Sequence, residues 1–342
     1  MPVRPRLRAA ALAREPGNVA MPLQLAVIIV NYRTAALTIG CLESLARELS
    51  SFPNSRVFVV DNGSGDGSAQ QIARAIEANR WSDWARLLPL ERNGGFAFGN
   101  NAVLRPLLQT PDKPAYVLLL NPDTIVRPGA IPALIDFMVQ HPAVGIVGSR
   151  LEDPDGTPQN SAFRFHTLMS ELDTQLRLGI FSRFIARWSK SPGFSDSALQ
   201  TDWVAGASML VRTEVFDSIG LLDEGYFLYF EEVDFCLRAL RTGWTCWYEP
   251  RSRVVHLVGQ STGVTNPKST GNRLPTYWFD SRRRYFVKNH GWLYASLVDL
   301  LWFVGHLLWQ LRRRIQGKPD RGPVGWLRDQ ARNSVFAKGF RL

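Results

Sequence analysis

The stretch Tyr116–Val126, YVLLLNPDTIV, contains four consecutive apolar residues followed directly by NPD. An uninterrupted apolar run of this length is typical of a strand buried on both faces, as in a parallel sheet. Asn, Pro and Asp are common turn residues, which would explain the polar end of the run. In open α/β sheets, however, ligands bind at the carboxyl ends of strands, so Asp123 could instead belong to a binding site.

Segments around this stretch alternate between strand and helix patterns. We expect strands at 23–32, 56–61, 85–90, 116–124 and 145–151, helices at 34–49, 68–78 and 128–140, and a Gly-rich turn feeding a helix at 93–108. Segment 202–212 reads as one further strand, 227–244 as a loop and helix, and 246–262 as a last strand and loop. Residues 152–201 are less regular and are expected to cover the site. The alternation predicts an α/β fold: a mostly parallel sheet with helices on both faces.

Composition and charge limit the function classes. The chain has 342 residues, 45% of them apolar, which suits one large α/β domain. Its three cysteines match no zinc motif, and a reducing compartment fits them best. From Gly271 onward there are 14 Lys/Arg and 4 Asp/Glu, whereas the central region is slightly acidic. This distribution argues against a nucleic-acid groove and favours an anionic surface met by the C-terminal segment.

The two ends differ from the central domain. Residues 1–21 are basic without an apolar core, so we expect a disordered arm rather than a signal peptide, and Met21 could be the start. The expected division is an arm at 1–21, a catalytic domain at 22–268 and a basic amphipathic helical extension at 269–342.

Polar residues end three of the expected strands. Asn31, Asp61 and Asp123 follow the first, second and fourth strands, and parallel strands bring such ends to one edge of the sheet. Neither a GxGxxG turn nor a Walker A lysine is present, which disfavours NAD-type and P-loop sites. The adjacent Gly94 and Gly95 would let a ligand approach the backbone closely.

Two side chains have the chemistry of metal ligands. A diphosphate is commonly neutralised by Mg²⁺ or Mn²⁺, which needs only one or two protein carboxylates, and Asp123 at a strand end suits this purpose. His256 ends another strand and could be a second ligand, which would favour Mn²⁺. A lone histidine is, however, more often structural.

A carboxylate cluster, Glu231, Glu232 and Asp234, begins a helix. The helix dipole favours acids in the first turn, and Asp234 could pair with Arg238 one turn later. The aromatic run GYFLYF before the cluster is expected to line a pocket. An ionised carboxylate beside such a pocket would suit a general base.

These motifs together resemble a known family. The ordered set VIIVNY, VVDNGS, RNGGFAFGNN, LLLNPD, WVAGASMLVR, FEEVDFCLR and VVHLVGQS is similar to family 2 glycosyltransferases of the GT-A fold, most of all to the bacterial rhamnosyltransferase-like branch. The resemblance covers about residues 24–262. It implies an inverting transfer from a nucleotide-sugar, with dTDP-rhamnose or a UDP-sugar as donor and a glycan or lipid-linked acceptor of cell-surface polysaccharide assembly.

The resemblance also implies site roles. Asp61 would contact the nucleotide base, Asp123 the metal, and His256 the metal or diphosphate. Glu232, with Glu231 beside it and Asp234 nearby, would supply the base. The expected nucleotide-sugar site comprises Asn31, Tyr32, Asp61, Asn62, Gly94, Gly95, Asn100, Asn121 and Asp123.

Trp203, Gly206 and Ala207 are expected on the acceptor side, because an aromatic face suits sugar stacking and small residues leave room. A buried core tryptophan is the alternative. Two other functions remain open. A nucleotidyltransferase would need a triphosphate-gripping loop that NYRTAALT does not resemble, and a non-catalytic nucleotide-sugar-binding protein would not need Glu232.

The segment Trp292–Gln310 has about the length of a membrane-spanning helix. Asp299 and His306 interrupt it, while aromatic residues and flanking arginines suit a membrane interface. We expect a helix lying peripherally on the anionic cytoplasmic face of the membrane, with packing on the catalytic domain as the alternative.

Overall fold

The computed structural model describes residues 24–49, 52, 54–177, 193–257, 273–320 and 322–342. The expected arm at 1–21 and the expected domain boundary at 268/269 lie outside these residues.

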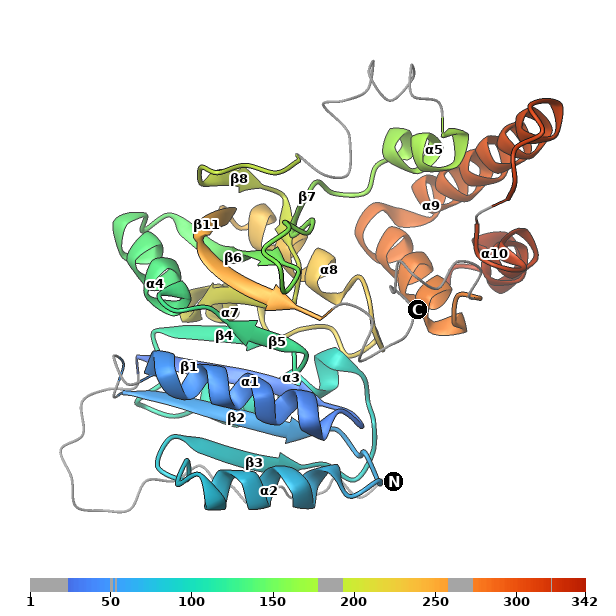
Figure 1. Cartoon of the computed structure of the whole chain (residues 1–342). Coiled ribbons are helices and arrows are strands. Elements are labelled where there is room, and N and C mark those ends of the chain that lie inside the picture. Colours follow the sequence, from blue (N-terminus) through green and yellow to red (C-terminus); the bar gives the residue numbers. More distant parts are fainter. Residues whose placement is uncertain (1–23, 50–51, 53, 178–192, 258–272, 321) are drawn as a thin grey trace.

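A mixed sheet organises the catalytic part (Figure 1). Its described strands lie in the order β3-β2-β1-β4-β10-β6-β11-β5, with β8 paired to β11. β1, β2, β3 and β4 are mutually parallel, and β6 is parallel to β11, whereas β10 runs antiparallel between β4 and β6. The bounds are β1 Leu25–Asn31, β2 Ser55–Asp61, β3 Ala85–Pro89, β4 Tyr116–Leu120, β5 Thr124–Val126, β6 Val144–Glu152, β8 Leu199–Thr201, β10 Ser208–Arg212 and β11 Thr245–His256.

Helices cover both faces of this sheet, as the alternation of patterns predicts. One face carries α1 Ala35–Glu48, α2 Ser68–Ala78 and α4 Ala130–Gln140. The other carries α3 Phe96–Leu107, α7 Thr213–Ile219 and α8 Glu231–Arg241. Each central strand therefore loses access to water on both sides.

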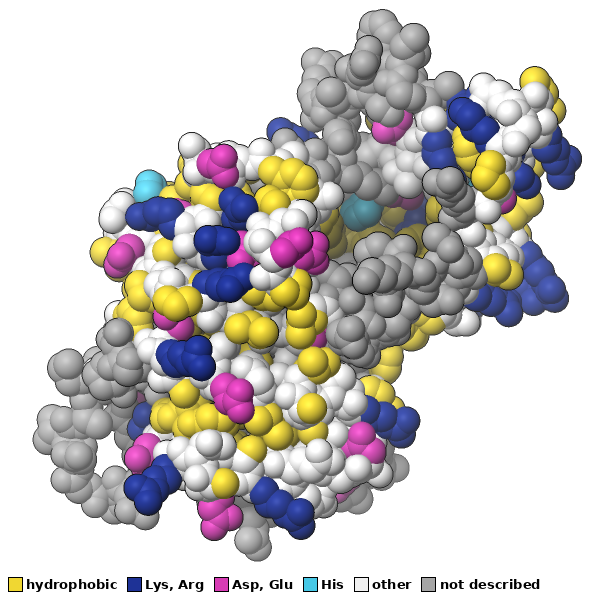
Figure 2. All heavy atoms as spheres, viewed as in Figure 1, with side chains coloured by type: hydrophobic (Ala, Val, Ile, Leu, Met, Phe, Trp, Pro, Cys, Tyr) yellow, Lys and Arg dark blue, Asp and Glu magenta, His cyan; other side chains and the backbone are white. Residues whose placement is uncertain are grey.

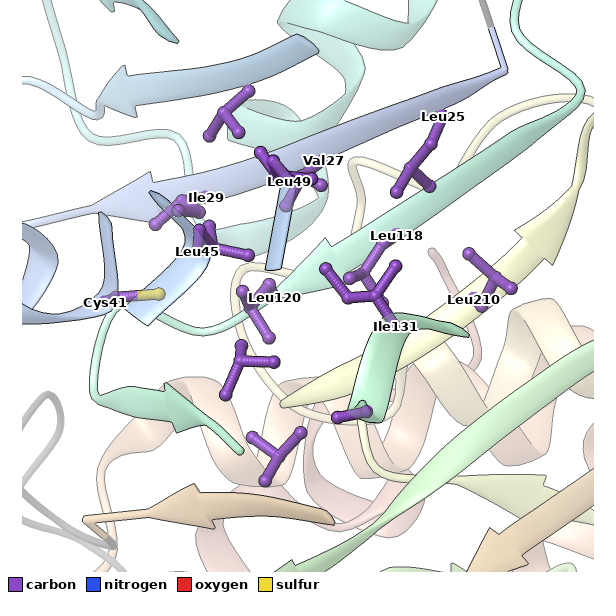
Figure 3. Packing of buried hydrophobic residues seen from close by; sticks show 14 of the residues in the cluster. Leu25, Val27, Ile29, Cys41, Leu45, Leu49, Leu118, Leu120, Ile131 and Leu210 are labelled. Carbon is purple, nitrogen blue, oxygen red and sulfur yellow. The ribbon is translucent and has the colours of Figure 1, made fainter. Parts of the chain in front are cut away.

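The apolar run in β4 illustrates this two-sided burial. Leu118 and Leu120 join the cluster beneath α1 and α4, while Val117 and Leu119 join the cluster beneath α3 and α8. Figure 3 shows Leu118 and Leu120 beside side chains of β1, α1 and α4. Fully burying such a side chain stabilises the fold by about 1.5–3 kcal/mol. Because all four positions of the run are buried, apolar residues are favourable at each of them.

Segment 202–212 is not the single strand that its sequence suggests. β9 Trp203–Val204 pairs with β7 Ala162–Phe163 in a separate two-stranded sheet, and β10 begins only at Ser208. Between them Ala205, Gly206 and Ala207 form a turn. Gly and Ala have low strand propensity, which explains the break.

The C-terminal extension is helical, as expected. α9 Thr276–Ile315 contains a non-helical residue, Gly291 (φ 83°), that divides it into two helices, and α10 Trp326–Asn333 and α11 Val335–Lys338 follow. α5 Leu168–Leu176, from the irregular segment, packs along α9 (Figure 1). By length and composition alone, α9 is long and apolar enough to cross a membrane.

Candidate active site

Asn31 and Asp61 lie opposite each other at the ends of β1 and β2. Both are buried, and the Asn31 amide donates to Asp61 Oδ1 at 2.7 Å. The hydroxyl of Ser64 also donates to this oxygen, at 2.5 Å, and the Asn31 Oδ1 accepts from Thr34 and Thr38. Asn31 therefore holds Asp61 in position. Among the described residues, the Asp61 Oδ2 accepts one bond, at 3.3 Å from the Ser64 backbone, and it keeps capacity for a ligand donor.

The glycine-rich turn before α3 is tied to the end of β2. The Asn62 amide donates at 3.0 Å both to Asn93 Oδ1 and to the Gly95 carbonyl. Gly95 has φ 90°, and a Cβ there would lie 1.9 Å from the carbonyl oxygen of Phe227. The close approach at Gly95 is thus to the loop before α8, and at Gly94 it is to the Phe98 ring.

Two further members of the expected nucleotide-sugar set lie directly after β1 and in α3. Tyr32 is partly exposed, with the Arg33 guanidinium over its ring at 5.1 Å. Asn100 is fully buried in α3; its amide donates to the Phe96 carbonyl, and its Oδ1 has no partner among the described residues.

Asp123 and His256 meet where β5 pairs with β11. Asp123 is 3% exposed, its Oδ1 lacks a hydrogen-bond partner within the described chain, and His256 Nε2 lies 3.6 Å from that oxygen. No group of three or more His, Cys, Asp or Glu side chains suited to a metal occurs among the residues described. A buried, unsatisfied carboxylate oxygen beside an imidazole fits a cation that takes its remaining ligands from elsewhere.

The turn at 205–207 contacts both the segment that contains Asp123 and the start of α8. The Asn121 backbone N–H donates to the Ala207 carbonyl at 3.0 Å. On the other side, a Cβ on Gly206 would lie 3.9 Å from the Cβ of Glu232 and 3.5 Å from the Phe96 ring. The start of the Asn121–Asp123 segment and the Glu232 side chain thus both lie next to this turn.

Glu231 and Glu232 begin α8 as adjacent carboxylic acids. Their Oε2 atoms are buried without a partner among the described side chains and backbone, although Glu232 as a whole stays partly exposed. Burial raises the pKa of Glu232 to about 7. Burial and then the charge of Glu232 raise the pKa of Glu231 well above its ordinary value.

Asp234 points to different partners. Its carboxylate accepts from Arg238 Nε at 2.9 Å, as its sequence spacing suggests, and also from Lys288 Nζ at 2.9 Å and Asn289 Nδ2 at 2.8 Å. These hydrogen bonds and charges outweigh burial and lower the pKa of Asp234. Asp234 thus joins α8 to α9 and is not brought together with Glu232.

Two of the four aromatic residues in the run before α8 pack against the extension, and the expectation that the run lines a pocket stays a prediction. Tyr226 and Phe230 are 0% and 6% exposed and share a cluster with Tyr285 and Phe286 of α9. Only Phe227 of the run's aromatic residues is open, at 37%. The extension thus buries Tyr226 and Phe230, for which the sequence predicted contact with a ligand.

Trp203 occupies a boundary position. Its ring stacks on Phe163 at 4.2 Å, and its Nε1 donates to the Arg164 carbonyl. It is partly exposed and packs against both the sheet core and the cluster beneath α9. Both the acceptor-side and the core interpretations of Trp203 therefore remain predictions.

Sequence reasoning missed Ser64 and the contacts from α9. Ser64 follows Asp61 in a Gly-Ser turn, a local signal that could have identified it as the Asp61 partner. Lys288 and Asn289 lie more than fifty residues after Asp234, so no local spacing reveals them.

The sequence is similar to a described protein family and to named bacterial enzymes. Residues 22–273 match the family described as "Glycosyltransferase like family 2". The chain is 30% identical over 257 residues to the N-acetylglucosaminyl-diphospho-decaprenol L-rhamnosyltransferase of Mycobacterium tuberculosis, covering 70% of this chain and 78% of that protein. It is 29% identical over 167 residues to the rhamnosyltransferase WbbL of Escherichia coli, covering 48% and 61%.

Solved structures support the fold. The mannosyltransferase PcManGT of Pyrobaculum calidifontis, in complex with GDP-Man and Mn²⁺, aligns with a TM-score of 0.53 at 14% identity, covering 98% of this chain and 88% of that one. GalNAc-T7 with UDP, GalNAc and Mn²⁺ aligns with a TM-score of 0.56 at 14% identity, covering 93% and 59%. The expected GT-A fold with a C-terminal helical region is confirmed.

Proposed function

The chain belongs to glycosyltransferase family 2, in its rhamnosyltransferase-like branch, and from this premise we propose that it transfers a sugar, with inversion, from a nucleotide diphosphate to a lipid-linked acceptor. The observation that carries the proposal is the turn at 205–207. It contacts Asn121, two residues before the orphaned Asp123 carboxylate, and it adjoins Glu232, whose Oε2 is buried without a described partner. A leaving-group site and a base near the same turn suit a displacement in which the acceptor oxygen attacks as the diphosphate leaves.

Glu232 is the proposed general base. Its Oε2 removes the proton from the acceptor hydroxyl, and the resulting oxygen bonds to the anomeric carbon as the bond to the diphosphate oxygen breaks. Glu231 shares its buried environment and raises the cost of ionising both acids together. A pKa of about 7 suits a base that works near neutral pH.

The diphosphate is proposed to lie at the strand ends near Asp123. Asp123 and His256 would hold a divalent cation, Mg²⁺ or Mn²⁺, which supplies charge neutralisation for the departing diphosphate. Asp61, fixed by Asn31 and Ser64, is proposed to bind the nucleotide through the remaining acceptor capacity of its Oδ2. The strand-end Asn62, Asn121 and Gly94–Gly95 turn would shape the same site.

The donor and acceptor proposals rest on the named relatives. Both bacterial relatives are rhamnosyltransferases, which favours dTDP-rhamnose over a UDP-sugar. The name of the mycobacterial relative includes N-acetylglucosaminyl-diphospho-decaprenol. We therefore propose a polyprenyl diphosphate sugar as the acceptor class, in cell-surface polysaccharide assembly.

A lipid-linked acceptor requires access to a membrane. In the second half of α9, Trp302 and Asp299 are buried toward α5, α10 and α11, and Asp299 accepts from the buried Arg282 at 2.7 Å. The opposite face is an apolar stripe whose side chains are 40–78% exposed: Leu293, Leu297, Leu300, Val304, Leu307, Leu308, Leu311 and Ile315. One packed face and one open apolar face suit a helix lying in the interface on the cytoplasmic side, rather than crossing the bilayer.

The test compares donor binding in wild type and Asp123→Asn. We expect dTDP-rhamnose with Mn²⁺ to raise the Tm of wild type more than UDP-sugars do, and nucleoside diphosphate release to require a polyprenyl diphosphate N-acetylglucosamine acceptor. Asp123→Asn keeps the side-chain volume but removes the charge, so the Mn²⁺-dependent part of the shift and turnover should be lost. A variant that keeps wild-type turnover at limiting metal would contradict the assignment of Asp123.

A further inference from the structure

A buried polar cluster joins the two halves of α9 that lie before and after the bend at Gly291. Arg282, before the bend, donates through Nη1 to Oδ1 of Asp299, after the bend, at 2.7 Å. Its Nε and Nη2 donate to Glu171 Oε2 of α5 at 3.1 and 2.9 Å. Arg282, Asp299 and Glu171 are 3%, 2% and 5% exposed. One buried guanidinium therefore connects both halves of α9 and α5.

Asp299 also connects α9 to the helices that follow it. Its Oδ1 accepts a second bond from the Gln330 amide of α10 at 2.9 Å, and its Oδ2 accepts from the Val335 backbone N–H of α11 at 2.8 Å. α5 and α10 both pack on α9 (Figure 1). The acid that interrupts the apolar segment 292–310 is thus bonded to α10 and α11 and, through Arg282, to α5.

The bend at Gly291 does not fix its own angle. Gly291 has φ 83°, and a Cβ at this position would meet no described atom within 4 Å outside its own helix. Glycine permits many backbone conformations, so an unpacked glycine restrains a bend weakly. Ala295 and Val298 after the bend share an apolar cluster with Tyr285 before it, but apolar burial is non-directional. The charge-assisted hydrogen bonds of Arg282 are directional and therefore restrain the angle.

Stability alone does not explain why this cluster is ionic. Buried ions lose their hydration, and the exchange of a buried ion pair for packed apolar side chains is often neutral or stabilising. The orientation that these bonds impose on α9 is the property that apolar side chains would not supply.

The angle of the bend matters because the two halves of α9 have different contacts. Before the bend, Lys288 and Asn289 donate to Asp234 of α8, the helix that also carries Glu232. After the bend, α9 carries the apolar stripe, and Figure 2 shows hydrophobic side chains among Lys and Arg on the outer part of the extension. The position of the stripe relative to the proposed base therefore depends on the angle at Gly291.

A membrane-embedded acceptor is reached only when the stripe lies in the interface and the active site lies over the acceptor at the same time. Two linked contacts strengthen each other only if the geometry between them permits both. We propose that Arg282 and Asp299 are positioning residues, which hold the two halves of α9 at the angle at which both contacts form. This inference rests on the proposed function, with its lipid-linked acceptor and its membrane contact.

The test measures transfer by the full chain to two acceptors. One is polyprenyl diphosphate N-acetylglucosamine in anionic vesicles, and the other is a water-soluble analogue with a short isoprenoid chain. Loss of positioning should lower transfer to the vesicle acceptor alone, whereas a loss of fold or chemistry lowers both. If wild type transfers sugar to neither acceptor, the proposed function is wrong. Equal losses on both acceptors in the variants would contradict only the positioning role.

Two variants alter the cluster in different ways. Arg282→Lys keeps the buried charge but loses the planar fork that bonds Glu171 and Asp299 together. Asp299→Asn keeps the side-chain volume and replaces one acceptor oxygen with a donor. In each, kcat/KM for the vesicle acceptor should fall by about tenfold or more, because linked contacts gain roughly 10²- to 10⁴-fold over single ones. The kcat/KM for the soluble acceptor and the co-sedimentation with vesicles should stay at wild-type values, since the active site and the stripe are intact.

Arg253→Lys is the matched control. Arg253 also donates two bonds to a buried carboxylate, that of Glu152, but it lies in β11 of the sheet. Transfer to both acceptors should be unchanged in this variant. The same acceptor-selective loss in Arg253→Lys would overturn the proposal.

The angle itself is measured by pulsed electron paramagnetic resonance between spin labels at Val139→Cys in α4 and Leu311→Cys in α9, two exposed positions. The native cysteines are buried, so the labels attach selectively. We expect a wider distance distribution in Arg282→Lys and Asp299→Asn than in wild type and Arg253→Lys. A distribution of wild-type width in the folded variants, or loss of the fold in both, would overturn the positioning role.

Discussion

The burial of the two adjacent acids Glu231 and Glu232 is unfavourable for the stability of the fold. Both Oε2 atoms are buried without a described partner, at the start of a helix whose preceding residues Tyr229 and Phe230 have positive φ. A non-glycine residue in that conformation costs of order 1 kcal/mol or more. Buried acids on a strained backbone lower the free energy of unfolding. Such unfavourable groups are found where they take part in a reaction.

At the scale of single residues, we expect kcat/KM for the acceptor to rise with pH through an apparent pKa near 7. Burial raises the pKa of Glu232 to about 7, so the base form appears only as pH rises through that value. Glu232→Gln should lower turnover by about 10²-fold or more and abolish this rising limb. The measurement is a pH–rate profile of wild type and variant, with the exposed Glu214→Gln as control.

The same titration affects stability with a definite sign. A carboxyl whose folded pKa is raised stabilises the fold fully below its unfolded pKa of 4.5, and that contribution is lost as pH rises to about 7. Wild type should therefore lose stability between pH 5 and 8, and Glu232→Gln should lose less. If Glu231→Gln lowers turnover strongly and Glu232→Gln lowers it only slightly, the base is Glu231.

Strand-end residues were predictable from sequence, but their partners were only partly so. Asp61 and Asp123 each follow a buried run, and a strand end is a local property of the chain. The neighbour of Gly95, the Phe227 carbonyl, belongs to a loop about 130 positions later, and no periodicity encodes that contact. The same limit explains why Asp234 could not be separated from Glu232 before its bonds to α9 were known.

At the scale of elements, periodicity predicted the regular segments and failed where small residues interrupt them. α2 occupies 68–78 as its apolar spacing indicates, because Ile72 and Ile76 alone must face the core. Segment 202–212 reads as one strand in the sequence, yet Gly206 and Ala207 turn the chain between two sheets. That turn later forms the centre of the candidate site.

The apolar stripe of α9 permits a prediction about this one helix. Leu300→Gln with Leu307→Gln should weaken vesicle binding at least tenfold, because each change removes an exposed leucine that would enter the interface, worth about 1 kcal/mol or more. Both positions are at least half exposed, so the Tm should hardly change. The measurement is co-sedimentation with anionic vesicles.

Val139→Gln with Leu240→Gln is the matched control, since these exposed apolar residues lie on α4 and α8. Arg312 is less suitable for such a test, because it donates to the carbonyls of Leu176 and Arg177 and thereby caps α5. Unchanged vesicle binding in the stripe variant, with the fold intact, would exclude the stripe as the membrane contact.

At the scale of the whole molecule, the extension is bonded to α8, which carries the proposed base, and to the loop before it. Lys288 of α9 donates to Asp223 at 2.8 Å and to Asp234 at 2.9 Å, and Arg284 donates to both oxygens of Asp223. The Ser281 hydroxyl also donates to the Leu228 carbonyl in the loop before α8. The extension thus contacts both ends of the segment that presents Glu231 and Glu232, so the proposed membrane contact and the proposed base lie on directly bonded elements.

Lys288→Gln tests this connection. The change leaves the buried Asp234 with Arg238 and Asn289 but without one cation, which should cost about 1–3 kcal/mol and lower the Tm by several degrees. Because the start of α8 is then less well positioned, kcat should fall about tenfold, while the KM for the donor should stay constant, since Asp61 and Asp123 lie on the sheet.

Lys338→Gln is the control, because its partner Asp280 is an exposed residue of the extension itself and such pairs contribute little. Steady-state kinetics in both substrates separates the outcomes: a lower Tm with unchanged kcat would mean that the connection stabilises the fold without positioning the base.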